Sequence, residues 1–330
     1  MKNHHKKIVD FVRERNSEKM LFTPGPAALL PENIIGLGPC FGRGDEDYDS
    51  VEFRVMEGLK KKSGHSKLVR MQGSASLAIE VMTLNYLYGR VLIIQSGYYS
   101  DRLLWLANSA RRRIGEVKEV IFIQWDMLEY VTERFDWVVA CYTETSFGLK
   151  IPIEILRRNA DRLSASLMID ATASIGLENG HELAEVISYS SCKGLFGLTG
   201  AAFVAYHNEP TVEVDSFYLS LSNHFNKMMT GPYSAIASLD LALKKHDEFL
   251  YAVVENKKVF MAKMEEYLTQ SRENQPTLCT HVSRKVRAID PRAILYTPRS
   301  SLEGSIICHL GEVHLGLSAR GEIINALEFL

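Results

Sequence analysis

Short apolar runs alternate with longer stretches of mixed polarity along the middle of the chain. The short runs have the length and composition of buried strands, and the stretches between them are long enough for helices. Strands that alternate with helices predict an α/β fold with a mainly parallel, doubly wound sheet whose loops gather at one edge. The predicted strands are 67–71, 90–95, 120–123, 137–140, 166–170, 186–190 and 201–206.

The two ends of the chain differ from this alternating core. Residues 1–20 mix charges with apolar residues at helical spacing, which predicts a short amphipathic helix packing on a small domain or a partner subunit. Residues 245–272 predict a long helix that leads to a smaller α+β domain. We therefore divide the chain into an N-terminal arm (1–20), a large domain (21–244) and a bridging helix with a small C-terminal domain (245–330).

Composition excludes several classes of partner. The chain has 330 residues, 46% of them hydrophobic and 24% charged, as is ordinary for a soluble enzyme. A formal net charge of −2 gives no reason to expect nucleic acid or an anionic membrane as partner. Five widely spaced cysteines without a C-x-x-C pair argue for a reducing compartment and against a disulfide framework or metal site. No apolar run approaches a membrane span and no signal peptide is evident, so we expect a cytoplasmic protein.

Lys193 is the first candidate catalytic residue. It lies between the predicted strands 186–190 and 201–206, followed by a glycine-rich turn. A lysine between buried strands is costly unless it is neutralised, paired or used covalently, although a strand-end lysine reaching solvent is the ordinary alternative. Asp170 ends the strand 166–170. The pair fits pyridoxal 5'-phosphate (PLP), because a lysine amine can hold the aldehyde and an aspartate can keep the pyridine nitrogen protonated.

A phosphate site is predicted where the strand 67–71 passes into a helix. Ser74, Ala75 and Ser76 open an apolar helix, so free backbone N–H groups, two hydroxyls and the helix dipole converge on one point. The alternative is an ordinary serine-capped helix start.

At these residues the chain resembles the class V branch of the fold-type I PLP-dependent aminotransferases. The relatives that it resembles most are the 2-aminoethylphosphonate:pyruvate and the serine or alanine:glyoxylate transaminases. The resemblance extends from Thr23 to about Leu243. It implies a mainly parallel sheet of the seven-stranded type, a smaller α+β C-terminal domain, PLP as cofactor and a homodimer with shared active sites.

The resemblance also assigns roles to single residues. Tyr99 would stack on the cofactor ring, and Thr145 belongs to a Glu-Thr-Ser motif whose hydroxyls contact the cofactor. Thr230 would reach across the dimer interface to the phosphate of the other subunit, although a helix cap is an equally good interpretation. Pro24 and Gly25 would pass the mouth of the active site.

The resemblance fails at the residue that should bind the substrate carboxylate. The family has the motif Phe-Arg-Ile-Gly near its C-terminus, and its arginine binds the substrate carboxylate through a bidentate pair of hydrogen bonds. Here the matching segment is Val313-His314-Leu315-Gly316, so His314 stands in place of arginine. Either another basic residue has taken over, with Arg320 as the first candidate, or the donor carries its anionic group elsewhere, as an aminophosphonate does.

The leading hypothesis is a transaminase that moves an amino group from a small amino acid or aminophosphonate to a small 2-oxo acid such as pyruvate or glyoxylate. Lys193 and Asp170 would be its catalytic residues. A second hypothesis is another PLP reaction of the lyase or desulfurase type, for which Cys308 and Cys279 lack a mobile loop. A third is a catalytically degenerate protein of this fold that acts by binding alone.

Overall fold

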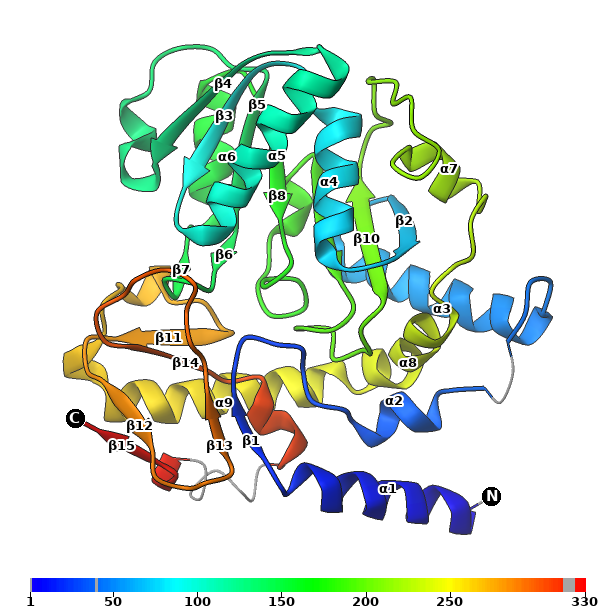
Figure 1. The fold of residues 1–330 in the computed structure, drawn as a ribbon, viewed down its shortest axis with the longest axis vertical. Helices are drawn as coiled ribbons and strands as arrows, with labels where there is room; N and C mark the ends of the chain where they lie inside the picture. The colour runs from blue at the N-terminus through cyan, green and yellow to red at the C-terminus, as the bar shows by residue number, and fades with distance from the viewer. Residues whose placement is uncertain (1, 39–40, 317–323) are drawn as a thin grey trace.

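The computed structural model describes residues 2–38, 41–316 and 324–330. Its centre is a seven-stranded sheet in the order β2-β10-β9-β8-β5-β3-β4 (Figure 1). In this sheet β10 runs antiparallel to both of its neighbours, and the other neighbouring strands pair in parallel. The predicted α/β sheet is therefore confirmed. Its strands are β2 (Lys67–Gln72), β3 (Gly89–Gln95), β4 (Val117–Gln124), β5 (Trp137–Cys141), β8 (Ser166–Asp170), β9 (Val186–Ser190) and β10 (Ala201–Tyr206).

Helices cover both faces of this sheet, which explains why its inner strands are mainly apolar. Along β3, Leu92 and Ile94 pack into one apolar cluster, while Val91 and Ile93 pack into the cluster on the opposite face. The helices α4 and α5 cover the face of Val91 and Ile93, and α3, α6 and α8 cover the other. Their bounds are α3 (Glu46–Ser63), α4 (Ala75–Tyr86), α5 (Tyr98–Ile114), α6 (Ile153–Arg162) and α8 (Tyr233–Lys244).

The C-terminal part begins with α9 (His246–Lys263), drawn in yellow beneath the sheet in Figure 1. The sequence predicted a helix over 245–272, but α9 is shorter. It ends where Met264 and Leu268 pack into the apolar cluster of the C-terminal part, and Leu268 also bridges to Val282. After α9 the chain forms two short 3-10 turns, η3 (Glu265–Tyr267) and η4 (Arg272–Asn274).

Short paired strands complete the C-terminal part. The strand β11 pairs with β14 and β12 with β15, both antiparallel, and β1 pairs in parallel with β13. The N-terminal strand is thus built into the same structure as the C-terminal residues, while the domain boundaries at 21 and 245 remain predictions. These strands are β1 (Met20–Phe22), β11 (Cys279–Val282), β12 (Val286–Ala288), β13 (Ala293–Leu295), β14 (Ser305–Cys308) and β15 (Leu327–Phe329).

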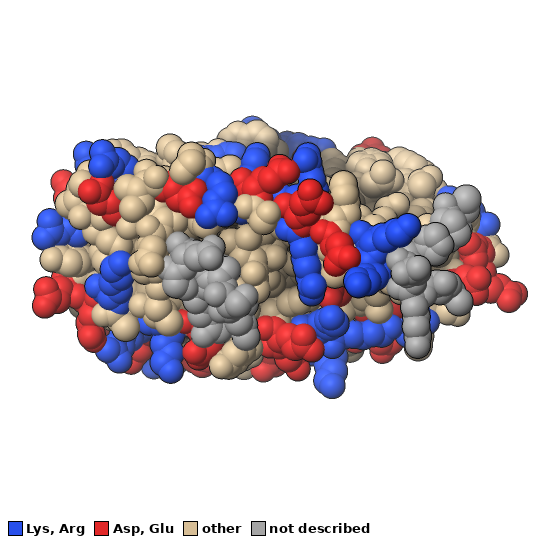
Figure 2. Space-filling model, turned by 90° about the horizontal axis from the view of Figure 1, so that it is seen from below, with Lys and Arg blue, Asp and Glu red and all other residues tan. Residues whose placement is uncertain are grey.

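The helix predicted for the N-terminal arm is α1 (Lys2–Asn16), at the bottom of Figure 1. It packs against α2 (Pro31–Ile35) and buries Val12, while Phe11 is exposed. Figure 2 views the molecule from this side and shows Lys and Arg interspersed with Asp and Glu. No helix within the described ranges is long and apolar enough to cross a membrane.

Candidate active site

A cavity of about 620 Å³ lies beside the ends of β2, β5, β8 and β9. Loops that follow parallel strands gather at this edge, where sheets of this kind bind their ligands. Residues 25–26 from the N-terminal segment and Arg299 from the C-terminal part also line the cavity. The predicted site residues that line it are Gly25, Ser74, Ala75, Ser76, Tyr99, Thr145, Asp170 and Lys193.

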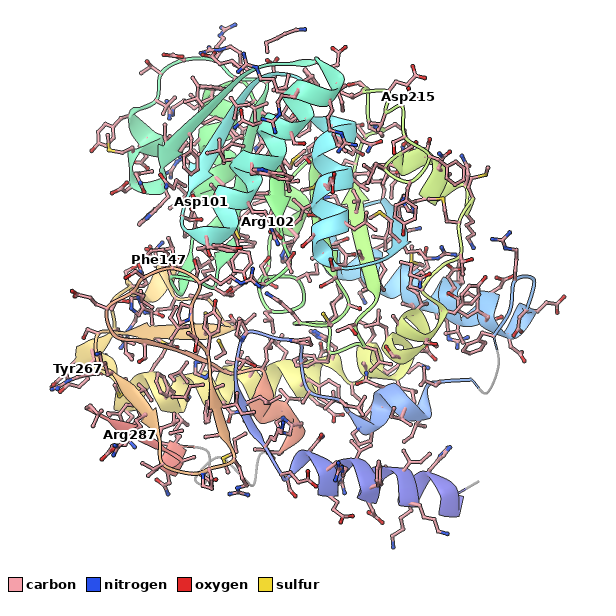
Figure 3. The ribbon with its side chains drawn as sticks, in the orientation of Figure 1. Asp101, Arg102, Phe147, Asp215, Tyr267 and Arg287 are labelled. Atoms are coloured by element: carbon pink, nitrogen blue, oxygen red, sulfur yellow. The ribbon has the colours of Figure 1, made fainter. Side chains whose placement is uncertain are left out.

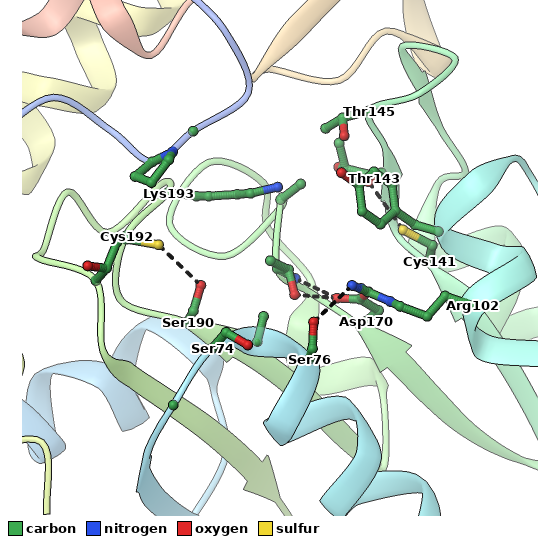
Figure 4. Close-up of a pocket in the computed structure, with 18 of the residues that line it drawn as sticks. Ser74, Ser76, Arg102, Cys141, Thr143, Thr145, Asp170, Ser190, Cys192 and Lys193 are labelled. Carbon is green, nitrogen blue, oxygen red and sulfur yellow. Dashed lines mark hydrogen bonds and ion pairs between the residues drawn. The ribbon is translucent and has the colours of Figure 1, made fainter. Parts of the chain in front are cut away.

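Asp170 is the last residue of β8 and is only 1% exposed. Its Oδ1 accepts hydrogen bonds from Thr172 N at 3.0 Å and Thr172 Oγ1 at 2.5 Å, and its Oδ2 accepts one from Arg102 Nη2 at 3.0 Å (Figure 4). A buried carboxylate without partners would be very costly, and these donors stabilise it in its charged form. The group is therefore suited to accept a hydrogen bond from a protonated ring nitrogen.

Tyr99 and Arg102 come from the first turns of α5. Figure 3 shows Arg102 on the inner side of this helix. Arg102 Cζ lies 5.1 Å from the centroid of the Tyr99 ring, and Lys193 Nζ lies 5.7 Å from the same centroid. Both distances are within the range of cation–π attraction. Arg102 also donates from Nη1 to Ser76 Oγ at 3.3 Å. Through Arg102, the start of α4 is thus connected to Asp170 at the end of β8.

Lys193 extends into the cavity from the loop after β9 (Figure 4). Its ammonium forms neither a hydrogen bond nor an ion pair with the described residues. Ala27 N donates to Cys192 O at 2.7 Å, which fixes the N-terminal segment beside the lysine. Gly25 has a φ of +126°, and a Cβ there would lie 3.0 Å from Lys193 Cγ. Glycine therefore lets this segment approach the lysine side chain closely.

The start of α4 offers the features of an anion site. Gly73 N donates to Gly200 O at 2.9 Å, which ties the loop before α4 to the loop that follows Lys193. Ser74 is the N-cap residue, but its side chain makes no capping hydrogen bond. The first N–H groups of a helix lack the partners that later ones have, and here residues 74–76 at the helix start line the cavity. A phosphate group fits these donors.

Glu144 is a buried carboxyl group that binds the start of α5 beside the cavity. Its Oε2 accepts hydrogen bonds from Tyr99 N and Ser100 N at 3.0 and 3.2 Å, and its Oε1 accepts from Ser146 N and Ser146 Oγ at 3.1 and 2.5 Å. Burial raises the pKa of this carboxyl group, and the hydrogen bonds oppose that rise. Glu144 thereby fixes the first turn of α5, and with it the position of Tyr99.

Buried polar atoms in the wall of the cavity, Thr143 Oγ1 and Arg102 Nε among them, have no hydrogen-bond partner in the described part of the chain. Buried polar groups are nearly always hydrogen-bonded, so orphaned groups that line one cavity indicate a polar ligand. Together with the free Lys193 amine and the start of α4, these groups fit a molecule that carries an aldehyde, a phosphate and a ring nitrogen, as PLP does.

The structure does not bring His314 into this cavity. The residue ends the 3-10 turn η5 (Gly311–His314), and its Nε2 lies 3.0 Å from Lys19 O, within hydrogen-bond distance. Its ring is thus turned to the N-terminal segment, and His314 is not among the described residues that line the cavity. Arg320, predicted as the first candidate to replace the missing arginine, lies outside the described residues.

Two further predicted residues lie beside the cavity or away from it. Pro24 directly precedes Gly25 but is not among the described cavity-lining residues. Thr230 is exposed between α7 (Leu221–Phe225) and α8, outside the cavity lining of its own chain. Its predicted role in the site of a second subunit remains a prediction.

Sequence reasoning missed some residues that line the cavity. Thr143 and Thr172 each stand two positions from a predicted residue, Thr145 and Asp170, and this spacing was an available signal. Arg299 had no local signal, because the segment that carries it reaches the cavity through the packing of the C-terminal part.

Comparison with known proteins places this fold among the aminotransferases. No known family model matches the chain. It is 25% identical over 254 residues to the 2-aminoethylphosphonate–pyruvate transaminase of Pseudomonas aeruginosa strain UCBPP-PA14, covering 69% of this chain and 68% of that relative. Its structure is similar to the subgroup IV aspartate aminotransferase of Thermus thermophilus, with a TM-score of 0.78, 17% identity, and 93% and 99% of the two chains covered. The alanine–glyoxylate aminotransferase of Nostoc sp. has a TM-score of 0.73, 17% identity, and 93% and 95% coverage.

The class of protein follows from these likenesses. The chain has the fold-type I architecture of PLP-dependent aminotransferases, and the predicted resemblance to class V is confirmed. The predictions of a transaminase and of PLP as its cofactor are confirmed as well, because curated relatives are named transaminases and the structural neighbours include aminotransferases and a PLP-linked protein.

Proposed function

We propose that the protein moves an amino group from a small amino acid or an aminophosphonate, such as 2-aminoethylphosphonate, to a small 2-oxo acid such as pyruvate or glyoxylate. The observation that carries this proposal is the shared cavity of Lys193 and Asp170, with a free amine on the first and a fully partnered carboxylate on the second. The names of the similar proteins support the substrate classes, since they include 2-aminoethylphosphonate–pyruvate and alanine–glyoxylate transaminases.

We propose the following roles for the described residues in holding the cofactor. When bound, PLP supplies an aldehyde for an amine and a ring that withdraws electrons from the carbon bearing that amine. In our proposal Ser74 and Ser76 bind its phosphate with the first N–H groups of α4. Tyr99 lies against its ring, Asp170 accepts a hydrogen bond from its ring nitrogen, and Lys193 holds its aldehyde.

Lys193 Nζ is also the group that moves the proton, once the amine of the donor has taken its place at the cofactor. A transaminase must take a proton from the carbon that carries the amino group and return it one position away. An amine that is free of hydrogen bonds and ion pairs to the described residues is available for this task, and it lies against the Tyr99 ring. Arg102 and Thr172 hold both oxygens of Asp170, which fixes the position of this carboxyl group.

The desulfurase alternative has less support from the structure. Cys279 and Cys308 face each other across the β11–β14 pair, and both are fully buried. Burial raises the pKa of the Cys308 thiol, which disfavours a reactive thiolate. A mobile, accessible nucleophile has the opposite properties.

We further propose that the enzyme is a cytoplasmic homodimer. The cytoplasm is supported by the free thiols of Cys141, Cys192, Cys279 and Cys308, which suit a reducing compartment. The homodimer is supported by the exposed Thr230 and by exposed apolar side chains near it.

The first test is covalent. Borohydride reduction of the PLP-loaded protein, followed by peptide mass mapping, should place a pyridoxyl group on Lys193. Lys193→Ala should remove the adduct and turnover, whereas Lys150→Ala, at a lysine paired with Glu178 at 3.2 Å, should keep both. An adduct on another residue would refute the assignment of Lys193.

The second test identifies the donor. Amino acids and 2-aminoethylphosphonate are mixed one at a time with the PLP-loaded enzyme, and conversion of bound cofactor to its pyridoxamine form is followed by absorbance. In a transaminase, at least one of these donors converts the bound cofactor to its pyridoxamine form, and pyruvate or glyoxylate then restores the original form. Release of pyruvate or sulfide without a pyridoxamine form would favour the lyase or desulfurase alternative instead.

A further inference from the structure

Arg299 is the cavity-lining residue that the C-terminal part contributes among the described residues. It lies in the segment between β13 and β14, well before the position at which the sequence predicted a substrate-binding residue. Two features of that segment hold it in place. Tyr296 and Leu302, on either side of Arg299, both pack against the apolar cluster of the C-terminal part.

The cations that line the cavity have different surroundings. Arg102 donates to the buried carboxylate of Asp170, so its charge is already matched. Lys193 is reserved for the cofactor in the proposed function. Arg299 has no carboxylate among its described partners and donates from Nη1 to Tyr98 Oη at 2.9 Å. A guanidinium carries five N–H donors, so most of those on Arg299 remain for another acceptor.

Aromatic rings set the place of Arg299 relative to the reacting amine. Its Cζ lies 5.1 Å from the centroid of the Tyr98 ring, and Tyr98 meets Tyr99 edge to face with centroids 5.3 Å apart. Tyr99 in turn faces Lys193 Nζ. The guanidinium is thus held by stacking and one hydrogen bond, two rings away from the amine. Arg299 and Lys193 line the same cavity, so both are accessible to one bound small molecule.

We infer that Arg299 binds the anionic group of the substrate, a carboxylate or a phosphonate. It would thus perform the role of the arginine in the family motif, at whose position this sequence has His314. The inference rests on the proposed function, because every proposed donor and acceptor carries such a group. A guanidinium binds carboxylate and phosphonate oxygens with paired, charge-assisted hydrogen bonds. Tyr98 is then a positioning residue, which holds the guanidinium without contacting the reacting atoms.

The competing interpretation is that Arg299 only fastens the C-terminal part to α5 through Tyr98. Glutamine can still donate to Tyr98 Oη but carries no charge, so Arg299→Gln separates the two roles. Loss of a residue with only a structural role would lower kcat/KM equally for all substrates. Loss of a substrate-binding residue would lower kcat/KM only for substrates that carry an anionic group.

The kinetic experiment compares L-alanine with 2-aminopropane, in which a methyl group replaces the carboxylate. In Arg299→Gln we expect kcat/KM for alanine to fall by about tenfold or more, mainly through KM, with that for 2-aminopropane unchanged. Arg299→Lys should recover part of the loss, because it keeps the charge without the fork. The control is Arg287→Gln, at an arginine paired with Glu328 on the outer edge of the C-terminal part (Figure 3). Equal losses for both amines, or no loss, would overturn the inference.

A second readout does not depend on turnover. Phenylglyoxal, which modifies exposed arginines, is applied with and without ethylphosphonate or pyruvate, and adducts are mapped by mass spectrometry. We expect both anions to protect Arg299 but not Arg287, and absence of protection at Arg299 would count against the inference. Protection at Arg299 without a pyridoxyl adduct on Lys193 would instead refute the proposed function and leave the anion site standing.

Discussion

At the scale of single residues, the strongest constraint is the set of donors around Asp170. Arg102 and Thr172 occupy both carboxylate oxygens, and the group is almost fully buried. In Asp170→Asn, Arg102 loses its counter-charge, and the ring nitrogen loses the negative charge on the acceptor that keeps it protonated. We expect PLP still to bind and turnover to fall roughly 10- to 100-fold, the equivalent of one charge-assisted hydrogen bond.

The measurement is turnover of the donor found in the absorbance screen, together with PLP affinity by absorbance titration. The control is Asp101→Asn, at the exposed neighbour of Arg102 on α5, which should retain its activity. Near-normal turnover in Asp170→Asn would mean that the carboxylate only stabilises the end of β8.

Lys193 and Asp170 could be predicted from the sequence because each is a charged residue at the end of a buried strand, where burial demands a reason. Arg299 and Tyr98 could not. Their meeting depends on how the C-terminal part packs beside α5, and no periodicity in the sequence encodes that contact. His314 was singled out because its position matched a motif, yet its ring faces the N-terminal segment.

A buried histidine gives a prediction of acid sensitivity. His181 is buried beside Ser174 and Tyr142, and burial lowers its pKa from 6.5 to about 3. The unfolded chain therefore binds a proton between pH 6.5 and 3 that the folded chain does not, so stability is lost as the pH falls through this window.

We expect His181 to account for on the order of 1–2 kcal/mol of the stability lost between pH 6.5 and pH 5. His181→Phe keeps an aromatic ring beside Tyr142 and removes the titrating group. Urea unfolding at several pH values should show a shallower decline in the variant below pH 6.5. An unchanged slope would show that His181 is not the group responsible.

At the scale of elements, the strands of the large sheet were predictable because helices cover both faces and leave continuous apolar runs. The end of α9 was not, since residues 264–272 still have a helical composition and only the packing of Met264 and Leu268 turns the chain. The pairing of β1 with β13 joins residues far apart in sequence, which local patterns do not report.

The junction of α5 with Glu144 yields a prediction at this scale. The two carboxylate oxygens of Glu144 together accept hydrogen bonds from the N–H groups of Tyr99, Ser100 and Ser146. Glu144→Gln leaves a single acceptor oxygen for these three groups. We expect the free energy of unfolding to fall by about 1–3 kcal/mol. PLP affinity should also fall, because the first turn of α5 carries Tyr99.

Urea unfolding and PLP titration check this expectation. Glu154→Gln is the matched control, since Glu154 is an exposed carboxylate in the first turn of α6. If Glu144→Gln kept both stability and PLP affinity, the start of α5 would be fixed by other contacts.

At the scale of the whole molecule, an apolar surface lies where the proposed homodimer would need one. Phe53 on α3 is 68% exposed, and Phe225 and Met228, in or just after α7, are 59% and 56% exposed. Phe53 and Phe225 line the same groove, and Thr230 follows two residues after Met228. Large apolar side chains that are exposed beside one groove are typical of interaction surfaces.

We predict that this surface is the contact between two copies of the chain. Phe53→Asp places a charge where the partner would bury it, at a cost of several kcal/mol, so the dimer should dissociate at concentrations where the wild type does not. Activity should fall in parallel if Thr230 completes the site of the other subunit. Tyr130→Asp is the control, because Tyr130 is 75% exposed in η1 (Trp125–Tyr130), next to β4 at the other end of the sheet. Light scattering and activity are measured on the same dilution series. A wild-type monomer with full activity, or an active dimer of Phe53→Asp, would show that the two copies do not meet at this surface.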